Sequence, residues 1–210
     1  MCMDAYLYTQ IALEWSFMKK KFLLILVLGF TLGCLASYYL FVLLQKDKFL
    51  PLYLQGEQLL TKKMYKEAIP YLYQSNFFNP NSYEIHLKLA ETFGELQCRG
   101  LSIGHYEQAI KLIEESGEHK IDEALAYSRL GDTYFLGSEF TLAEKNYITS
   151  IVKEAKLPDP YMGLGFLYER LGMVEDSIKY FEKYLELEIR KSKETNIAMI
   201  KTKLKKLKQK

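Results

Sequence analysis

The 210-residue sequence has few cysteines, and it lacks the short motifs that mark most nucleotide and metal sites. Its three cysteines, Cys2, Cys34 and Cys98, are scattered and odd in number, which argues against a disulfide framework. The sequence contains no glycine-rich phosphate-binding loop and no dinucleotide fingerprint. Its three histidines have neither cysteine partners nor the i, i+4 spacing of a helical metal site. We therefore expect neither a metal nor a cofactor.

Two serine motifs resemble those of hydrolases, but they occur in the wrong context. Residues 100–104 read Gly-Leu-Ser-Ile-Gly, which fits the pattern G-x-S-x-G, and residues 150–153 fit S-x-x-K. The first pattern needs a buried strand before its serine, and no segment of this sequence alternates between apolar and polar residues as a strand does. Ser102 is expected in a loop between helices and Ser150 inside a helix. The sequence thus predicts no enzyme.

Small residues recur with a fixed period along most of the chain. Gly56 and Ala90 are 34 residues apart, and so are Gly131 and Gly165. A second small residue follows twelve positions after three of these four, namely Ala68, Ala143 and Ser177. Such a period is typical of stacked helical hairpins, in which two backbones approach closely. It favours a binding scaffold.

The second unit departs from this spacing. We assign Ala109 as the partner of Ala90, nineteen positions on, which implies an insertion of seven residues. The insertion is expected within residues 94–104, where it would swell the loop of the second hairpin.

The spaced residues resemble the tetratricopeptide repeat pattern, W-x2-L-G-x2-Y, then A-x3-F, then P. The leucine and the small residue occur as Leu89-Ala90, Leu130-Gly131 and Leu164-Gly165. No unit has the opening tryptophan, and only the first keeps the terminal proline, as Pro80. The resemblance implies an all-α fold, an α-solenoid of about four helical hairpins. The expected repeat domain covers 49–190, with units at about 49–82, 83–123, 124–157 and 158–190.

The resemblance also implies a function, because the first helix of each unit in this family lines a concave groove that binds peptides or helices of other proteins. Only Arg129 fits the cluster with which some members grip a C-terminal carboxylate, so that ligand class is disfavoured. An apolar patch flanked by Arg129 and Arg170 suggests instead an apolar segment that carries an acid. The groove candidates are Tyr53, Glu57, Lys88, Glu91, Arg129, Asp132, Phe135, Met162, Phe166 and Arg170.

The last twenty residues, 191–210, hold eight lysines and one acid, Glu194. Ile197, Ile200, Leu204 and Leu207 form a narrow apolar stripe among these lysines at helical spacing. We interpret the segment as a basic helix that caps the last hairpin. Contact of the lysines with anionic lipid or nucleic acid is the alternative, but no nucleic acid partner is expected if the tail faces outward.

Residues 22–44 are a run of 23 residues without a charge. A helix of this length crosses about 30 Å of hydrocarbon, which predicts a single transmembrane helix that contacts the bilayer. A cleaved secretory signal has a shorter apolar core. Residues 31–34 are also similar to a bacterial lipoprotein signal, which would make Cys34 a lipidation site, although the sequence stays apolar after this cysteine.

The flanking sequence suggests an orientation for this span. Three lysines at 19–21 favour a cytoplasmic N-terminus, with the repeat domain outside the cytoplasm, in the periplasm if the source is bacterial. Gly29, Gly33 and Ser37 recur every four residues, a spacing typical of helices that pack closely as a homodimer. Residues 1–21 form an N-terminal tail without a recognisable motif, and Met18 is an alternative start.

The sequence as a whole thus predicts a membrane-anchored scaffold for protein–protein interaction, with a role in envelope assembly or secretion by analogy of architecture. A lipid-anchored or self-associating structural protein without a peptide ligand is the alternative.

Overall fold

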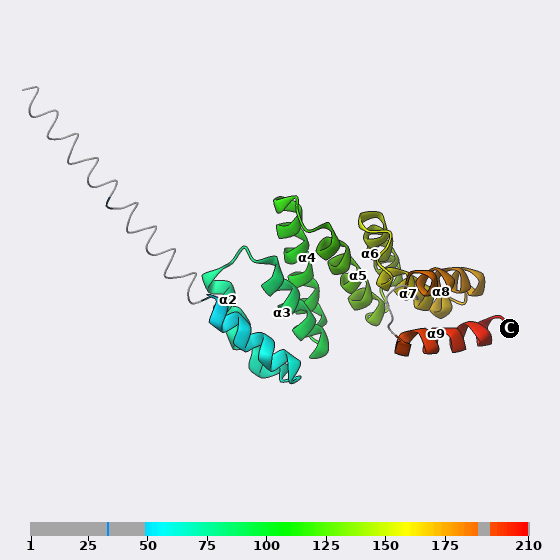
Figure 1. Cartoon of the computed structure of the whole chain (residues 1–210), viewed down its shortest axis with the longest axis horizontal. Helices are drawn as coiled ribbons and strands as arrows, with labels where there is room; N and C mark the ends of the chain where they lie inside the picture. Colours follow the sequence, from blue (N-terminus) through cyan, green and yellow to red (C-terminus); the bar gives the residue numbers. More distant parts are fainter. Residues whose placement is uncertain (1–32, 34–48, 189–193, 210) are drawn as a thin grey trace, which may run out of the picture. The chain divides into compact units, whose positions relative to one another are not determined.

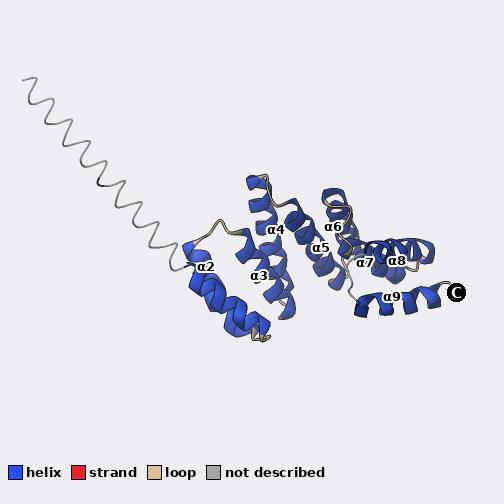
Figure 2. Ribbon diagram, in the orientation of Figure 1, coloured by secondary structure: helices blue, strands red, loops and turns tan. Residues whose placement is uncertain are grey.

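The computed structural model describes residues 49–188 and 194–209, together with Gly33. These residues form helices joined by short loops and contain no strand (Figures 1 and 2). A helix covers residues 49–61. It is followed by α2 (Tyr65–Phe78), α3 (Tyr83–Glu95), α4 (Arg99–Ser116), α5 (Lys120–Leu136), α6 (Phe140–Lys153), α7 (Asp159–Leu171), α8 (Val174–Glu188) and α9 (Glu194–Leu207).

The helices pack as consecutive hairpins. α3 pairs with α4, α5 with α6 and α7 with α8, and each hairpin packs on the next through α2 and α3, α4 and α5, and α6 and α7. α5 also contacts α7, so the first helices of neighbouring hairpins lie side by side. We call the side formed by residues 49–61, α3, α5 and α7 the inner face. The all-α solenoid of repeat-like hairpins is confirmed.

The periodic glycines lie where a first helix meets the second helix of its own hairpin. A Cβ atom at Gly131 would lie 2.7 Å from the ring of Tyr147, and one at Gly165 would lie 2.5 Å from the ring of Phe181. Such separations are far below ordinary van der Waals contact, so these aromatic rings can pack against the helix only because the side chain is missing. The period in the sequence is therefore a packing requirement.

The second hairpin follows the same rule, and the predicted swollen loop is wrong. The Ser102 hydroxyl donates a 2.8 Å hydrogen bond to the Ala90 carbonyl, as the Ser177 hydroxyl does to the Gly165 carbonyl, again over 2.8 Å. Each serine follows its partner by twelve residues, so Ser102, and not Ala109, is the equivalent small residue. Ser102 accordingly lies in α4 and not in a loop.

The extra residues of the second unit lengthen two helices. α4 has 18 residues and α5 has 17, against 14 in α6 and 13 in α7. The connection between α3 and α4 is only residues 96–98. The insertion therefore lengthens the C-terminal end of α4 and the N-terminal end of α5, on either side of the loop that joins them.

The basic C-terminal segment folds back as α9 and packs on the last hairpin. Ile200, Leu204 and Leu207 are buried in one apolar cluster with Phe181 and Tyr184. These three residues belong to the stripe seen in the sequence, and their spacing explains why one side of α9 is buried while its lysines remain at the surface.

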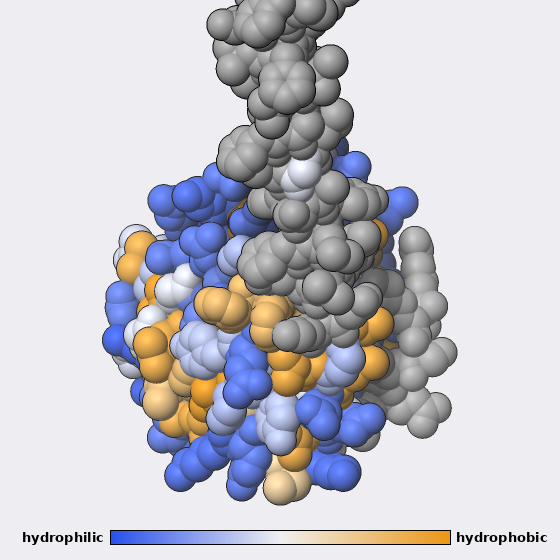
Figure 3. Space-filling model, turned by 90° about the vertical axis from the view of Figure 1, so that its left-hand side faces the viewer, coloured by the Kyte–Doolittle hydropathy of each residue, from blue (hydrophilic) through white to orange (hydrophobic). Residues whose placement is uncertain are grey.

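The first hairpin has no such covering in the part of the chain that the structure describes. Leu50, Leu54 and Phe77 expose 54%, 47% and 74% of their surface. Figure 3 shows apolar side chains gathered among polar ones on the face that this hairpin presents.

The predicted single-pass membrane localisation, with the repeats outside the cytoplasm, must be corrected. Among the described residues, no helix is long and apolar enough to cross a membrane. The helices from α2 to α9 have 13 to 18 residues and mix apolar with polar positions, whereas a span needs about 20 mostly apolar residues. The segment 22–44, on which the prediction relied, lies outside the described residues except for Gly33, and so do Gly29, Ser37 and Cys34.

Candidate functional site

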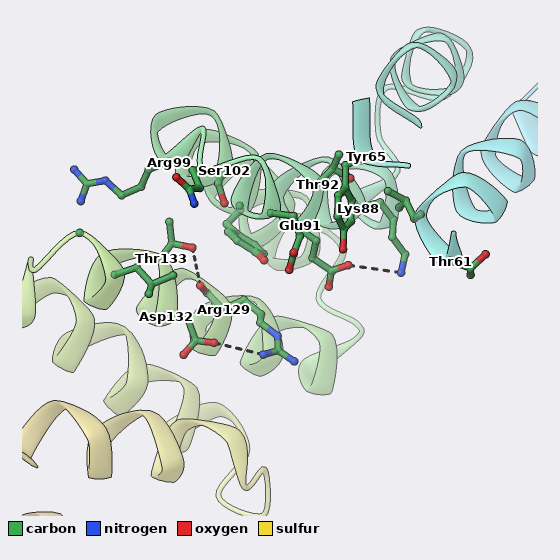
Figure 4. A pocket seen from close by; sticks show the side chains of 17 residues that line it. Thr61, Tyr65, Lys88, Glu91, Thr92, Arg99, Ser102, Arg129, Asp132 and Thr133 are labelled. Atoms are coloured by element: carbon green, nitrogen blue, oxygen red, sulfur yellow. Dashed lines mark hydrogen bonds and ion pairs between the residues drawn. The ribbon is translucent and has the colours of Figure 1, made fainter. Parts of the chain in front are cut away.

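A cavity of about 980 Å³ opens on the inner face, between α3 and α5. The end of helix 49–61, the first turns of α2 and α4, and the facing sides of α3 and α5 supply its walls. Figure 4 shows Lys88 and Glu91 on α3, and Arg129 and Asp132 on α5 on the other side of the cavity. Lys88 and Arg129, 41 positions apart in the sequence, therefore line the same cavity from two neighbouring hairpins.

The ion pairs that Lys88 and Arg129 form at this cavity are long and open to water. Lys88 Nζ lies 3.8 Å from Glu57 Oε1 and 3.8 Å from Glu91 Oε2, and all three side chains are about one-third to one-half exposed. Arg129 Nη1 is 3.4 Å from Asp132 Oδ2, and its Nη2 is 4.0 Å from an Asp159 carboxylate oxygen. Exposed pairs of this length contribute little stability. They leave the charged groups available to a ligand.

Asp132 has a second role, because it also accepts a 2.8 Å hydrogen bond from the Tyr147 hydroxyl. Burial raises the pKa of Asp132, and the hydrogen bond from Tyr147 and the charge of Arg129 only partly oppose this. Burial, together with Asp132, raises the pKa of Tyr147 as well. The carboxyl group thus ties α5 to α6 beneath the cavity.

Tyr106 lies at the base of the cavity, 4% exposed. It packs in a cluster with Ala90, Ile110, Ala126 and Leu130. Burial and the nearby Glu91 raise its pKa, so its hydroxyl remains a neutral hydrogen-bonding group at any physiological pH. The cavity therefore has an aromatic floor beneath a charged rim.

The structure brings together five of the residues predicted for the groove, Glu57, Lys88, Glu91, Arg129 and Asp132. Tyr53 joins this group, since its hydroxyl donates to Glu57 Oε1 over 3.2 Å.

The predicted apolar patch is divided between two clusters. Phe135 packs beside Phe140 of its own hairpin, with ring centroids 5.9 Å apart. Met162 and Phe166 pack instead against the cluster that includes α9, and the Phe166 ring lies edge-on to that of Phe181 at 5.1 Å. Arg170, in the last turn of α7, is exposed.

Sequence reasoning missed other residues that line the cavity, among them Thr92, Glu95, Arg99 and Tyr106. Arg99 forms a 2.5 Å ion pair with Glu139 of the next hairpin. The error in register hid Glu95 and Arg99, because both fell in the supposed swollen loop, residues 94–104. Reading Ser102 as the small residue twelve positions after Ala90 would have placed them beside the groove.

The two serine motifs are structural. Ser102 and Ser150 are both fully buried, and their hydroxyls donate to the backbone carbonyls of Ala90 and Ala124 over 2.8 and 2.6 Å. A hydroxyl held by a backbone carbonyl in a helix-to-helix contact is not free to attack a substrate.

Two of the histidines meet between the first and second hairpins. His86 Nδ1 and His105 Nδ1 are 3.1 Å apart, and His105 Nε2 is 3.2 Å from the Tyr73 hydroxyl. Burial, with a smaller effect of His86, lowers the pKa of His105 to about 4. Burial also lowers the pKa of His86. Over the described residues, no three histidine, cysteine, aspartate or glutamate side chains gather as a metal site would require.

The fourth hairpin matches a known sequence family. Residues 158–188 fit the pattern described as tetratricopeptide repeat. None of the curated proteins matches the chain.

Solved structures share the fold. MamA is 25% identical, with a TM-score of 0.60, and the match covers 69% of this chain and 81% of that one. A Cut9–Hcn1 hetero-tetramer of APC/C is 14% identical with a TM-score of 0.66, covering 74% of this chain and 29% of that one. BtubC from P. vanneervenii is 16% identical with a TM-score of 0.64, covering 74% and 70%. At such low identities, the last two show similarity of fold alone.

Proposed function

Because this chain is a tetratricopeptide repeat protein, we propose that it is a scaffold whose inner face binds a segment of a partner protein. The observation that carries the proposal is the cavity of about 980 Å³ between α3 and α5, with its half-exposed charged rim and aromatic floor. Its volume is that of an ordinary ligand-binding cleft. The proposed role is binding and not catalysis.

The geometry supports a segment more than a small molecule. The cavity is lined by residues of helix 49–61, α3 and α5, with charged side chains on α3 and α5, and Glu57 of helix 49–61 lies 3.8 Å from Lys88. An elongated ligand could reach several of these side chains at once, as extended peptides and helices do in grooves. A role in envelope assembly or secretion depended on the predicted membrane span, and it is not part of the proposal.

Photo-crosslinking tests this function with two matched exposed residues. Leu136 lines the cavity and is 81% exposed, whereas Val152, near the end of α6, does not line it and is 77% exposed. A benzoylphenylalanine at position 136 should form an adduct with a partner protein in cells of the source organism. The same group at position 152 should not give that adduct. Equal adducts from both positions, or none from position 136, would refute the proposal.

Self-association without a peptide ligand is the second candidate. The exposed Leu50, Leu54 and Phe77 on the first hairpin favour it, because adjoining apolar side chains at a surface often mark an interface. Sedimentation velocity of the full chain, with Phe77→Ser as the comparison, separates the two functions. A dimer of the unaltered chain that becomes a monomer on Phe77→Ser substitution would favour self-association.

A further inference from the structure

We propose that the segment bound between α3 and α5 is basic, a lysine or arginine flanked by aliphatic side chains and supplied by a partner protein. This inference rests on the binding function proposed above and adds the charge of the occupant. It reverses the sign expected from the sequence, which suggested an apolar segment carrying an acid. Two independent observations lead to it: the charge balance of the cavity, and the way α9 already uses the inner face of α7.

The charge balance favours a cation. The cavity is lined by Lys88, Arg99 and Arg129, and each of them already contacts at least one carboxylate. Lys88 and Arg129 have two acidic neighbours each, and Arg99 has one, within 4.0 Å. The acids concerned are Glu57, Glu91, Asp132, Asp159 and Glu139.

Of these five acids, Glu91 and Asp132 line the cavity, and so does a sixth acid, Glu95. Among the described residues it forms no ion pair, and it lies near Tyr65, whose pKa burial and Glu95 raise. Glu57, Glu139 and Asp159 contact the three cations from outside the lining, so six acids in all accompany three cations here, and acids remain in excess even if Asp132 is protonated. An incoming carboxylate would meet this excess, whereas an incoming lysine or arginine would be drawn to it.

The chain itself shows how such a cation is held. α9 places Lys203 Nζ 2.6 Å from Glu169 Oε2 of α7, and 5.0 Å from the centre of the Phe166 ring. Ile200 and Leu204 on the same side of α9 are buried. A lysine between a carboxylate and an aromatic ring, with aliphatic neighbours, is therefore the ligand that the first helix of the last hairpin holds.

The α3–α5 cavity, between the second and third hairpins, offers the same chemistry. Glu91 and Glu95 supply carboxylates, and Tyr106 and Leu60 supply the aromatic and aliphatic surface. In this cavity, however, no described segment of the chain plays the part that Lys203 plays on α7. The occupant must come from elsewhere.

Fluorescence anisotropy of two labelled synthetic peptides with the full chain tests the inference. The peptides have the same length and the same leucines, and they carry either lysines or glutamates at the same positions. We expect the lysine peptide to bind and to weaken as salt screens the charges. A double variant, Glu91→Gln with Glu95→Gln, should reduce its affinity by about tenfold, which is the effect of about 1.4 kcal/mol.

Glu115→Gln is the matched control. Glu115 is 60% exposed, pairs with Lys111 on α4 and does not line the cavity, so this variant should bind like the unaltered chain. Tighter binding of the glutamate peptide, failure of the lysine peptide to bind, or equal effects of the double variant and the control would each overturn the inference. A dimer of the chain that the double variant dissolves would also overturn it, since the occupant would then be a second copy. Crosslinking from position 136 would still report separately whether the groove binds a protein.

Discussion

The first and last hairpins of the repeat domain differ in how their apolar surfaces are covered. α9 closes the last hairpin and buries Ile200, Leu204 and Leu207, whereas the first hairpin exposes Leu50 and Leu54 within the described residues. Terminal repeats lack a neighbour on one side, so each end of a solenoid needs some cover for the surface that an inner repeat would bury. The comparison teaches that apolar residues at the two ends, although alike in sequence, should contribute very differently to stability.

The largest effect is expected at the covered end. Ile200→Ala should lower the free energy of unfolding by about 2–4 kcal/mol, because Ile200 is fully buried and its truncation leaves a cavity. Urea denaturation followed by circular dichroism measures this loss. Met199→Ala is the control on the same helix, since Met199 is 46% exposed and should cost less than about 0.5 kcal/mol. Equal losses would show that the buried side chains of α9 do not stabilise the last hairpin.

The next effect compares the close contacts within the two hairpins. Gly165→Ala should destabilise the protein by about 1–3 kcal/mol, since the new Cβ would meet the stiff Phe181 ring at 2.5 Å. Gly56→Ala should cost less, because the nearest atom, at 2.9 Å, is the mobile end of Leu72. Thermal unfolding of both variants ranks them.

Gly104→Ala supplies the reference for these glycines. Nothing lies within 4 Å of a Cβ at this position in α4, so the substitution should stabilise the protein by about 0.5–1 kcal/mol. If Gly56→Ala lowered the thermal stability more than Gly165→Ala, the contact with Leu72 would be the more rigid of the two, and the prediction would be wrong.

A change of pH should have a smaller effect on stability, through His105, which contacts Tyr73 of the first hairpin. The pKa of His105 in the folded protein, about 4, lies below the value near 6.5 of a free imidazole. Between these values the unfolded chain binds the proton more readily, so stability is complete above pH 6.5 and falls as pH drops towards 4. Because the imidazole is only half-buried, we expect this loss to be about 1 kcal/mol.

His105→Gln isolates this contribution from the titration of carboxyl groups. The variant should lose less stability than the unaltered protein when urea denaturation is repeated at pH 6.5 and at pH 4.5. Identical pH dependence in the two proteins would mean that burial does not lower the pKa of His105 in the folded protein.

The smallest effect is expected at the uncovered end. Leu54→Gln should change the free energy of unfolding by less than about 0.5 kcal/mol, because nearly half of the side chain already meets solvent. Urea denaturation at several protein concentrations is the measurement. A loss of about 2 kcal/mol, as at Ile200, would show that something covers this hairpin in solution.

The spacing of small residues was enough to predict the hairpins, because a glycine or alanine at intervals of 34 residues, and once of 41, reports directly on backbone contact. The stripe of Ile200, Leu204 and Leu207 predicted the buried side of α9 for the same reason: its spacing matches one face of a helix. Both are local patterns, and each needs only the geometry of a helix to be understood.

The second hairpin shows where such reading failed. Ala109 is small, which made it a credible partner for Ala90, although Ser102 has the regular spacing of twelve residues; the hydrogen bond from Ser102 to the Ala90 carbonyl shows that Ser102 is the partner. For a similar reason, only some of the residues of the candidate groove were predicted. Lys88, Glu91 and Arg129 follow from the repeat spacing, but the excess of acids depends on which side chains of different hairpins meet.

The serine bonds to Ala90 and Gly165 also bear on how the chain folds. Each joins groups only twelve residues apart, so closing the intervening loop loses little chain entropy. Contacts this local favour fast folding. During synthesis a hairpin has its own closing contact as soon as its second helix emerges, before the following hairpin exists. The order of the hairpins along the sequence can thus also be the order in which they form.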